Sequence, residues 1–268
     1  FDTLRALLSA GVPPSSNGFC NALVVAAGEP EGAAAVEQLL DAGVPVNCTA
    51  NGLLPALGVD ARFGDQAVHA AARCGATATL GLLVRRGADV NAASAGGCRP
   101  LHFAASAGQA AAVAFLIEHG ADPSAGGSAG HRPLSAAVTN GAMAAAAALL
   151  DGGADAAAVD HGGNTALHCA AAQRGAECVE LLLDRGAPIG ASNGEGLQAV
   201  HVAAQANAGP SALRALLGRG ANVHAQDVAG QQPIHHAAEG LCDDALEVLL
   251  EHGADANGPG ADGKRPLH

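Results

Sequence analysis

The stretch "RPLHFAASAGQAAAVAFLIEHGAD", residues 99–122, returns along the chain with other residues at its variable positions. "TALHCAAAQRGAECVELLLDRGAP" begins at Thr165, "QPIHHAAEGLCDDALEVLLEHGAD" begins at Gln232, and a shortened "RPLH" ends the sequence. The glycine that closes each second apolar run recurs in steps of 32, 44, 33, 33, 33, 34 and 33 residues, at Gly11, Gly43, Gly87, Gly120, Gly153, Gly186, Gly220 and Gly253. A leucine stands four residues before every one of them. Because a fixed period marks a repeat architecture, the sequence predicts a solenoid built from one small unit.

One unit is expected to hold two short helices. The apolar run that follows Pro100 starts with a residue suited to the first helical position, and it ends at Gly108. The run at 110–119 has apolar residues spaced by three and four, and Gly120 ends it. Residues 121–131 contain turn formers without any period, which favours a hairpin-like connector. Since isolated helices shorter than about 12 residues are marginal in water, each unit must pack on its neighbours.

These units resemble ankyrin repeats, a family with a 33-residue unit and the signature T-P-L-H-x-A-A followed by L-L-x-x-G-A-D-V-N. The resemblance rests on "RPLHFAA", "TALHCAA", "QPIHHAA" and "LLVRRGADVN". It implies an all-α ankyrin repeat solenoid of stacked helix-turn-helix units with hairpin-like connectors, forming one monomeric array over residues 1–268. The expected units are approximately 12–44, 45–88, 89–121, 122–154, 155–187, 188–221 and 222–254, with partial units 1–11 and 255–268 and an insertion within 48–65. We expect the chain to be a piece of a longer protein, because it starts with Phe1 and stops inside the repeated phrase.

A histidine stands at the fourth position of the motif in six copies, at His69, His102, His168, His201, His235 and His268, and Ser135 and Val24 replace it in the other two. A catalytic or metal-binding histidine occurs once or twice in a site with partners of other types, whereas this one recurs once per unit. We therefore predict a structural role, in which the histidine bonds the backbone of the adjoining turn. The adjacent His235 and His236 would diverge by about 100° on a helix, so they cannot share a zinc ion. The sequence indicates no catalytic residue, no metal and no cofactor.

Composition argues against several classes of partner. The net charge is −12, from 13 basic and 25 acidic residues, and tryptophan and tyrosine are absent, which disfavours phosphate binding and base stacking by a nucleic-acid-binding protein. No apolar stretch approaches the roughly 18 residues of a membrane span. The seven cysteines form no C-x-x-C pair and are odd in number, which fits a reducing compartment, the cytoplasm or the nucleus.

The resemblance implies a non-catalytic scaffold that binds a partner protein, of unknown identity, through its hairpin tips and the inner face of its helices. Transferring the family's contact positions by register predicts a set of binding residues: Arg62, Phe63, Arg73, His131, Thr139, Asn140, His161, Asn164, Gln173, Leu197, Gln205 and Val228. Two alternatives stay open. The array could be the targeting or regulatory arm of a larger enzyme or channel, or a structural spacer, against which the varied polar tip residues argue.

Two further features allow more than one interpretation. Eleven additional residues fall between Asn47 and Gln66, inside a connector, where repeat proteins accept insertions. They are either a tolerated loop or a segment that presents Arg62 and Phe63 to a partner. The phrase "LVRRGADVN", which ends at Asn91, matches the sites that asparaginyl hydroxylases accept in ankyrin repeats, but we favour the interpretation in which Asn91 only shapes its connector.

Overall fold

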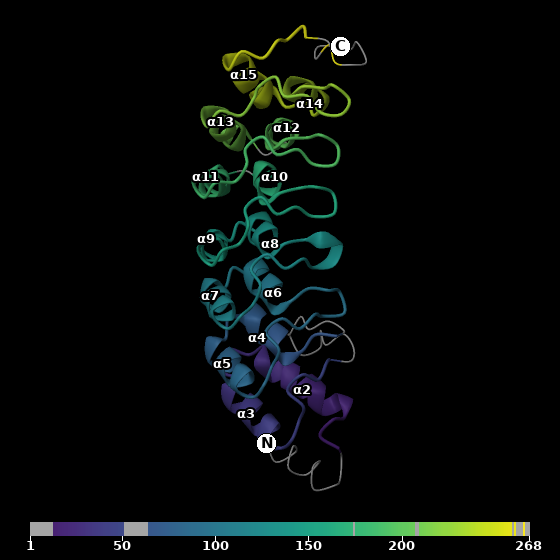
Figure 1. Ribbon diagram of the computed structural model, residues 1–268, viewed down its shortest axis with the longest axis vertical. Coiled ribbons are helices and arrows are strands. Elements are labelled where there is room, and N and C mark those ends of the chain that lie inside the picture. Colours follow the sequence, from purple (N-terminus) through teal and green to yellow (C-terminus); the bar gives the residue numbers. More distant parts are fainter. Residues whose placement is uncertain are drawn as a thin grey trace. The chain divides into compact units, whose positions relative to one another are not determined.

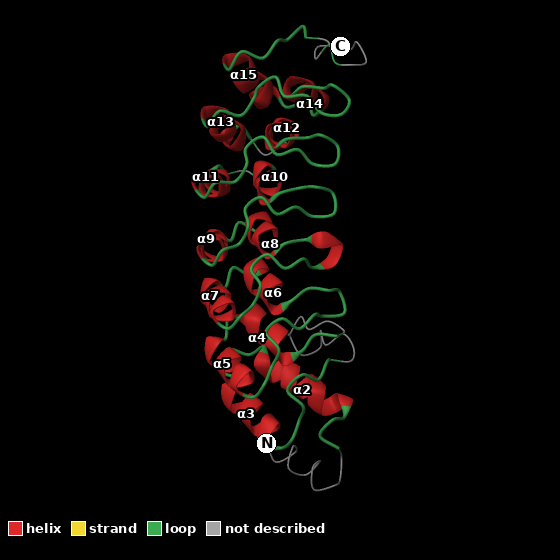
Figure 2. Ribbon diagram, in the orientation of Figure 1, coloured by secondary structure: helices red, strands yellow, loops and turns green. Residues whose placement is uncertain are grey.

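The computed structural model describes residues 13–50, 64–173, 175–206, 209–258, 260 and 265. It contains the α-helices α2 (Asn17–Ala27), α3 (Ala33–Asp41), α4 (Ala67–Cys74), α5 (Thr77–Arg85), α6 (Pro100–Ser106), α7 (Ala110–Glu118), α8 (Pro133–Thr139), α9 (Met143–Asp151), α10 (Ala166–Ala171), α11 (Glu177–Asp184), α12 (Ala199–Gln205), α13 (Ser211–Gly218), α14 (Pro233–Glu239) and α15 (Asp243–Glu251), with one 3-10 turn, η2 (Ser128–Gly130) (Figure 1). Helices alternate with loops, and the described residues form no strand beyond one isolated bridge between Thr49 and Gln66 (Figure 2). The predicted all-α fold is confirmed. No helix in this part of the chain is both long and apolar enough to cross a bilayer.

Each helix pair begins and ends for local reasons. Pro100, Pro133 and Pro233 occupy the first turn of α6, α8 and α14, where proline's missing N–H loses no helical hydrogen bond. Two residues after the end of each second helix stands a glycine with φ between 83° and 90°. This left-handed conformation is strained for any residue that carries a Cβ atom. The glycine period read from the sequence is therefore the period of helix termination.

The chain divides into two compact units, residues 1–128 with 144–153, and residues 129–143 with 154–268. In the first unit, α2, α4 and α6 contact one another in order, and α3, α5 and α7 form a second row. Their core consists of leucines and small residues: Leu23, Leu80, Leu83, Leu101 and Leu116 are fully buried. Fully burying one such side chain contributes about 1.5 to 3 kcal/mol.

In the second unit, α8, α10, α12 and α14 contact one another in order, and α11, α13 and α15 form the other row. One motif alanine in each first helix is buried to 2% exposure or less, at Ala137, Ala170, Ala203 and Ala237. These short side chains let the first helices approach closely. The larger core residues are again aliphatic, at Leu167, Leu182, Leu213, Leu216, Ile234 and Leu249.

Candidate functional site

The repeated histidine joins two stretches of backbone. Its Nδ1 accepts the N–H of the residue that precedes the helix, at 3.0 to 3.2 Å, in His69, His102, His168, His201 and His235. In four of these rings Nε2 lies 2.9 to 3.1 Å from a carbonyl oxygen of the following connector, at Ala92, Leu197, Ala225 and Gly258. Because Nδ1 accepts a hydrogen bond, the proton resides on Nε2, which donates to that carbonyl. The ring links one helix to the next connector, while His268 lies outside the described residues.

Burial favours the neutral form of three of these rings. It lowers the pKa of His69, His168 and His201 below the ordinary value, and the neighbouring His236 lowers that of His201 further. With both ring nitrogens committed to backbone, such a ring has no lone pair left for a substrate or a metal ion. Within the described ranges, no group of three or more histidine, cysteine, aspartate or glutamate residues is arranged to hold a metal ion.

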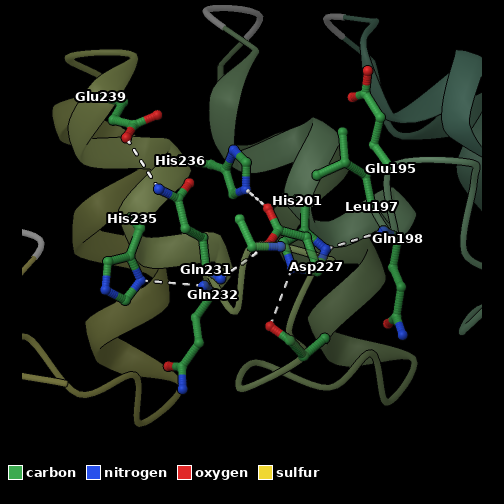
Figure 3. A network of polar contacts seen from close by, with 12 residues as sticks. Glu195, Leu197, Gln198, His201, Asp227, Gln231, Gln232, His235, His236 and Glu239 are labelled. Atoms are coloured by element: carbon green, nitrogen blue, oxygen red, sulfur yellow. Dashed lines mark hydrogen bonds and ion pairs between the residues drawn. The ribbon is translucent and has the colours of Figure 1, made fainter. Parts of the chain in front are cut away.

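A polar network ties one connector to α14 (Figure 3). Asp227 Oδ1 accepts the N–H groups of Ala229 and Gln231 at 2.8 and 2.9 Å, and Oδ2 lies 2.8 Å from His236 Nε2. Burial alone would raise the pKa of Asp227, but these hydrogen bonds outweigh it and the pKa is lowered. His235 reaches Gln232 instead, so the two adjacent histidines have different partners, as Figure 3 shows.

The connectors of the second unit end in hairpin tips, residues 160–164, 193–197 and 227–231, each closed by a backbone hydrogen bond of 2.9 or 3.0 Å. Successive tips are bonded to each other. Gly194 N–H donates to Gly162 C=O at 2.8 Å, and Val228 N–H donates to Glu195 C=O at 3.1 Å. The tips therefore form a row with fixed spacing. Their side chains project from a backbone that these hydrogen bonds hold in place.

Most of the predicted binding residues in this unit are accessible. His131, Thr139, Asn140, His161 and Gln205 are exposed, and Val228 is 77% exposed. His161 and Val228 lie on hairpin tips, and His131 directly follows η2. Thr139, Asn140, Gln173 and Gln205 lie at or just after the ends of α8, α10 and α12. The structure thus places these residues along the tips and the ends of the first helices.

Other predicted residues are engaged within the fold. Asn164 is half-buried, with Nδ2 3.4 Å from both Asp160 carboxylate oxygens and Oδ1 accepting from Asn193 Nδ2 at 2.9 Å. Leu197 is half-buried too, and its carbonyl accepts the bond from His168. Sequence reasoning missed Glu239, which is exposed at the end of α14 and has Oε1 3.4 Å from Gln231 Nε2. Its motif position is that of Thr139 and Gln205, so the register could have identified it.

In the first unit, the predicted binding residue Arg73 is paired with other residues of the fold. Its guanidinium donates to the buried Asp65 carboxylate at 2.8 Å and lies over the Phe103 ring, 4.8 Å from the centroid. Its side chain is 23% exposed. Arg62 and Phe63, in the insertion, lie outside the described residues.

Asn91 connects its own connector to the next one. Its Nδ2 donates to Gly120 C=O at 2.9 Å, and its Oδ1 accepts from Asp122 N–H at 3.2 Å. Asn47 makes the same pair of bonds one unit earlier, to Gly87 and Asp89, both at 3.2 Å. These bonds support the structural interpretation of Asn91, and the match to a hydroxylation site stays an untested alternative.

Comparisons with known proteins agree with this architecture. A family model described as ankyrin repeats in three copies matches residues 23–127, 124–193 and 200–268. The human ASB11 ankyrin repeat domain is 27% identical, with a TM-score of 0.67 over 75% of this chain and 89% of that one. The ankyrin repeat domain of Bcl-3, described as a unique member of the IkappaB protein family, is 30% identical, with a TM-score of 0.67 over 76% of this chain and 93% of that one. No curated protein matches the sequence. Since the family model covers most of the chain, and the helix pairs and their terminating glycines follow its period, the chain belongs to the ankyrin repeat family.

Proposed function

We propose that this chain is a non-catalytic scaffold that binds a partner protein through the hairpin tips and first-helix ends of its second unit. Ankyrin repeats are generally protein–protein interaction modules. The observation that carries the proposal is the row of exposed polar side chains at the helix ends, Thr139, Asn140, Gln205 and Glu239, beside tips bonded to one another. Such a preorganised surface loses little entropy when a partner binds.

The chemistry of the described residues supports a binding role over a catalytic one. The repeated histidines use their ring nitrogens for backbone bonds, and no enzyme family is indicated by the comparisons. We also propose that the protein works in the cytoplasm or nucleus, on the number and spacing of its cysteines.

The expected affinity is modest. Binding energy concentrates in Trp, Tyr and Arg side chains, and the proposed surface offers small polar residues instead. Arg73, the described arginine among the predicted contacts, is already paired with Asp65. We expect a Kd on the order of micromolar, because area without such anchors converts poorly into affinity.

Paired substitutions within the second unit test the location of the surface. Once proximity labelling and co-purification have identified a partner, its affinity is measured for Asn140→Arg plus Gln173→Arg. The matched control, Ser211→Arg plus Gly218→Arg, adds the same charge at exposed positions of α13, in the other row of helices. We expect at least about a tenfold loss for the first pair and less than a twofold change for the control. If only the control pair lost binding, with circular dichroism showing both proteins folded, the proposed surface would be wrong.

A further inference from the structure

The turn between α14 and α15 carries a leucine in a strained conformation. Leu241 has φ +53° and a side chain that is 87% exposed. In the corresponding turns of other repeats, Gly75, Gly108 and Gly141 have φ of 74°, 73° and 67°. Glycine adopts this region without steric cost, but leucine does not. Because the side chain is exposed to water, it gains no burial energy that would offset the backbone strain. The fold alone therefore does not account for a leucine at this position.

The backbone of this turn is held tightly. The N–H groups of Leu241 and Cys242 donate to carbonyls of α14 at 3.2 and 3.0 Å. A Cβ atom on Gly240 would lie 3.0 Å from the Gln205 carbonyl oxygen, to which the Cys242 thiol donates at 3.6 Å. The turn is therefore packed against the end of α12, and Leu241 projects from a fixed base. A partner that covers it would not have to order the backbone.

Beside Leu241 lies a hollow of about 240 Å³, lined also by Ala206, Gly209, Cys242, Asp243, Asp244 and Ala245. Pockets for drug-sized ligands are roughly 300 to 1,000 Å³. This hollow is smaller, and its size suits one or two side chains of a peptide.

The charge around the hollow determines which side chains fit. Asp243 and Asp244 are exposed, and neither has an ion-pair partner among the described residues. Neither α14 nor α15 contains a lysine or an arginine. A basic side chain complements this surface, and an acidic one would be repelled.

We propose that Leu241, Asp243 and Asp244, together called the turn site, dock a segment of a partner protein in which an apolar residue adjoins a lysine or arginine. The apolar side chain would pack on Leu241, and the cation would lie near the two carboxylates. This inference rests on the proposed function, since the occupant is a protein, and it adds a chemically defined contact at the edge of the proposed surface.

A random peptide library displayed on phage tests the turn site without a known partner. The library is selected on the full chain, and enriched peptides are measured by fluorescence anisotropy. We expect peptides with an apolar residue next to Lys or Arg. Leu241→Gly should weaken the binding of these peptides about tenfold or more, because the peptide's apolar residue loses the leucine on which it packs. Asp243→Asn plus Asp244→Asn should weaken binding and reduce its salt dependence. The control Leu250→Ala, at a leucine of α15 that is 48% exposed, should stay within twofold.

Leu241→Gly should also melt at a higher temperature than the parent, because it relieves the strained backbone. A lower melting temperature would contradict the strain argument, and unfolding could then explain a loss of binding. The turn site is refuted if no peptide is enriched, if the enriched peptides lack basic residues, or if Leu241→Gly binds them as the parent does. Peptides that lose binding to Asn140→Arg plus Gln173→Arg but keep it to Leu241→Gly would refute the turn site and leave the proposed function standing.

Discussion

Replacing His201 with alanine would remove one link between α12 and the connector that follows it. The ring is 0% exposed, its Nδ1 accepts the Gln198 N–H at 3.0 Å, and its Nε2 donates to the Ala225 carbonyl at 3.1 Å. The ring also packs edge-on against His236, with centroids 5.4 Å apart. Alanine cannot replace any of these contacts, so two backbone groups lose their partners where water has little access.

The magnitude follows from those two groups. Leaving a buried donor or acceptor unsatisfied costs about 1 to 3 kcal/mol. Two such groups and the lost ring contacts, offset in part by local relaxation, should lower the free energy of unfolding by about 2 to 5 kcal/mol. Native domains are stable by only about 5 to 15 kcal/mol, so this is a large fraction.

Urea denaturation followed by circular dichroism measures the effect, because the chain has no tryptophan or tyrosine to serve as a fluorescent probe. The matched control is His224→Ala, at an exposed histidine of the same unit, and it should change stability by less than about 0.5 kcal/mol. If His201→Ala lowered the free energy of unfolding no more than this control does, the hydrogen bonds of the His201 ring would not stabilise the fold, and the reasoning would fail.

Two other predictions concern pH and backbone geometry. Burial lowers the pKa of His168 and His201, so below their ordinary value of 6.5 the unfolded chain binds protons that the folded rings do not. The urea midpoint should therefore fall as pH is lowered from about 7.5 to 5.5 and change little above about 7.5; a midpoint that rose on acidification would contradict neutral rings. Gly196→Ala should lower the free energy of unfolding by at least about 1 to 3 kcal/mol, because φ at this position is +76°. The new Cβ atom would also lie 2.6 Å from the backbone nitrogen of Val228, whose N–H donates to the Glu195 carbonyl of the neighbouring tip. The control in the same urea assay is Gly190→Ala, where a Cβ atom meets no atom within 4 Å. If both variants lost the same free energy of unfolding, the contact between tips would not be the reason for glycine at position 196.

The sequence by itself determined the repeat and the fold class. Proline at the start of a helix and glycine after its end act through their own backbone angles, which depend on the residue and its immediate neighbours. Their period therefore predicted the helix pairs, and recurrence of the histidine in six of the eight motif copies argued against a single catalytic centre. The register selected Thr139, Asn140 and Gln205 as binding residues, and the structure places them, exposed, at or just after helix ends, while their role in binding stays a prediction.

Only the tertiary structure decided which polar side chains are available. Arg73 and Asn164 occupy positions that the register predicts as contacts, yet Arg73 pairs with Asp65 and Asn164 with Asn193. Leu241 stands at the motif position that Gly75, Gly108 and Gly141 occupy, but only the structure shows that its side chain is 87% exposed and that its φ is +53°. The period specifies the backbone that all units share. The contacts of Arg73 and Asn164 instead join residues at variable positions, and their pairing depends on which side chains the folded chain brings together.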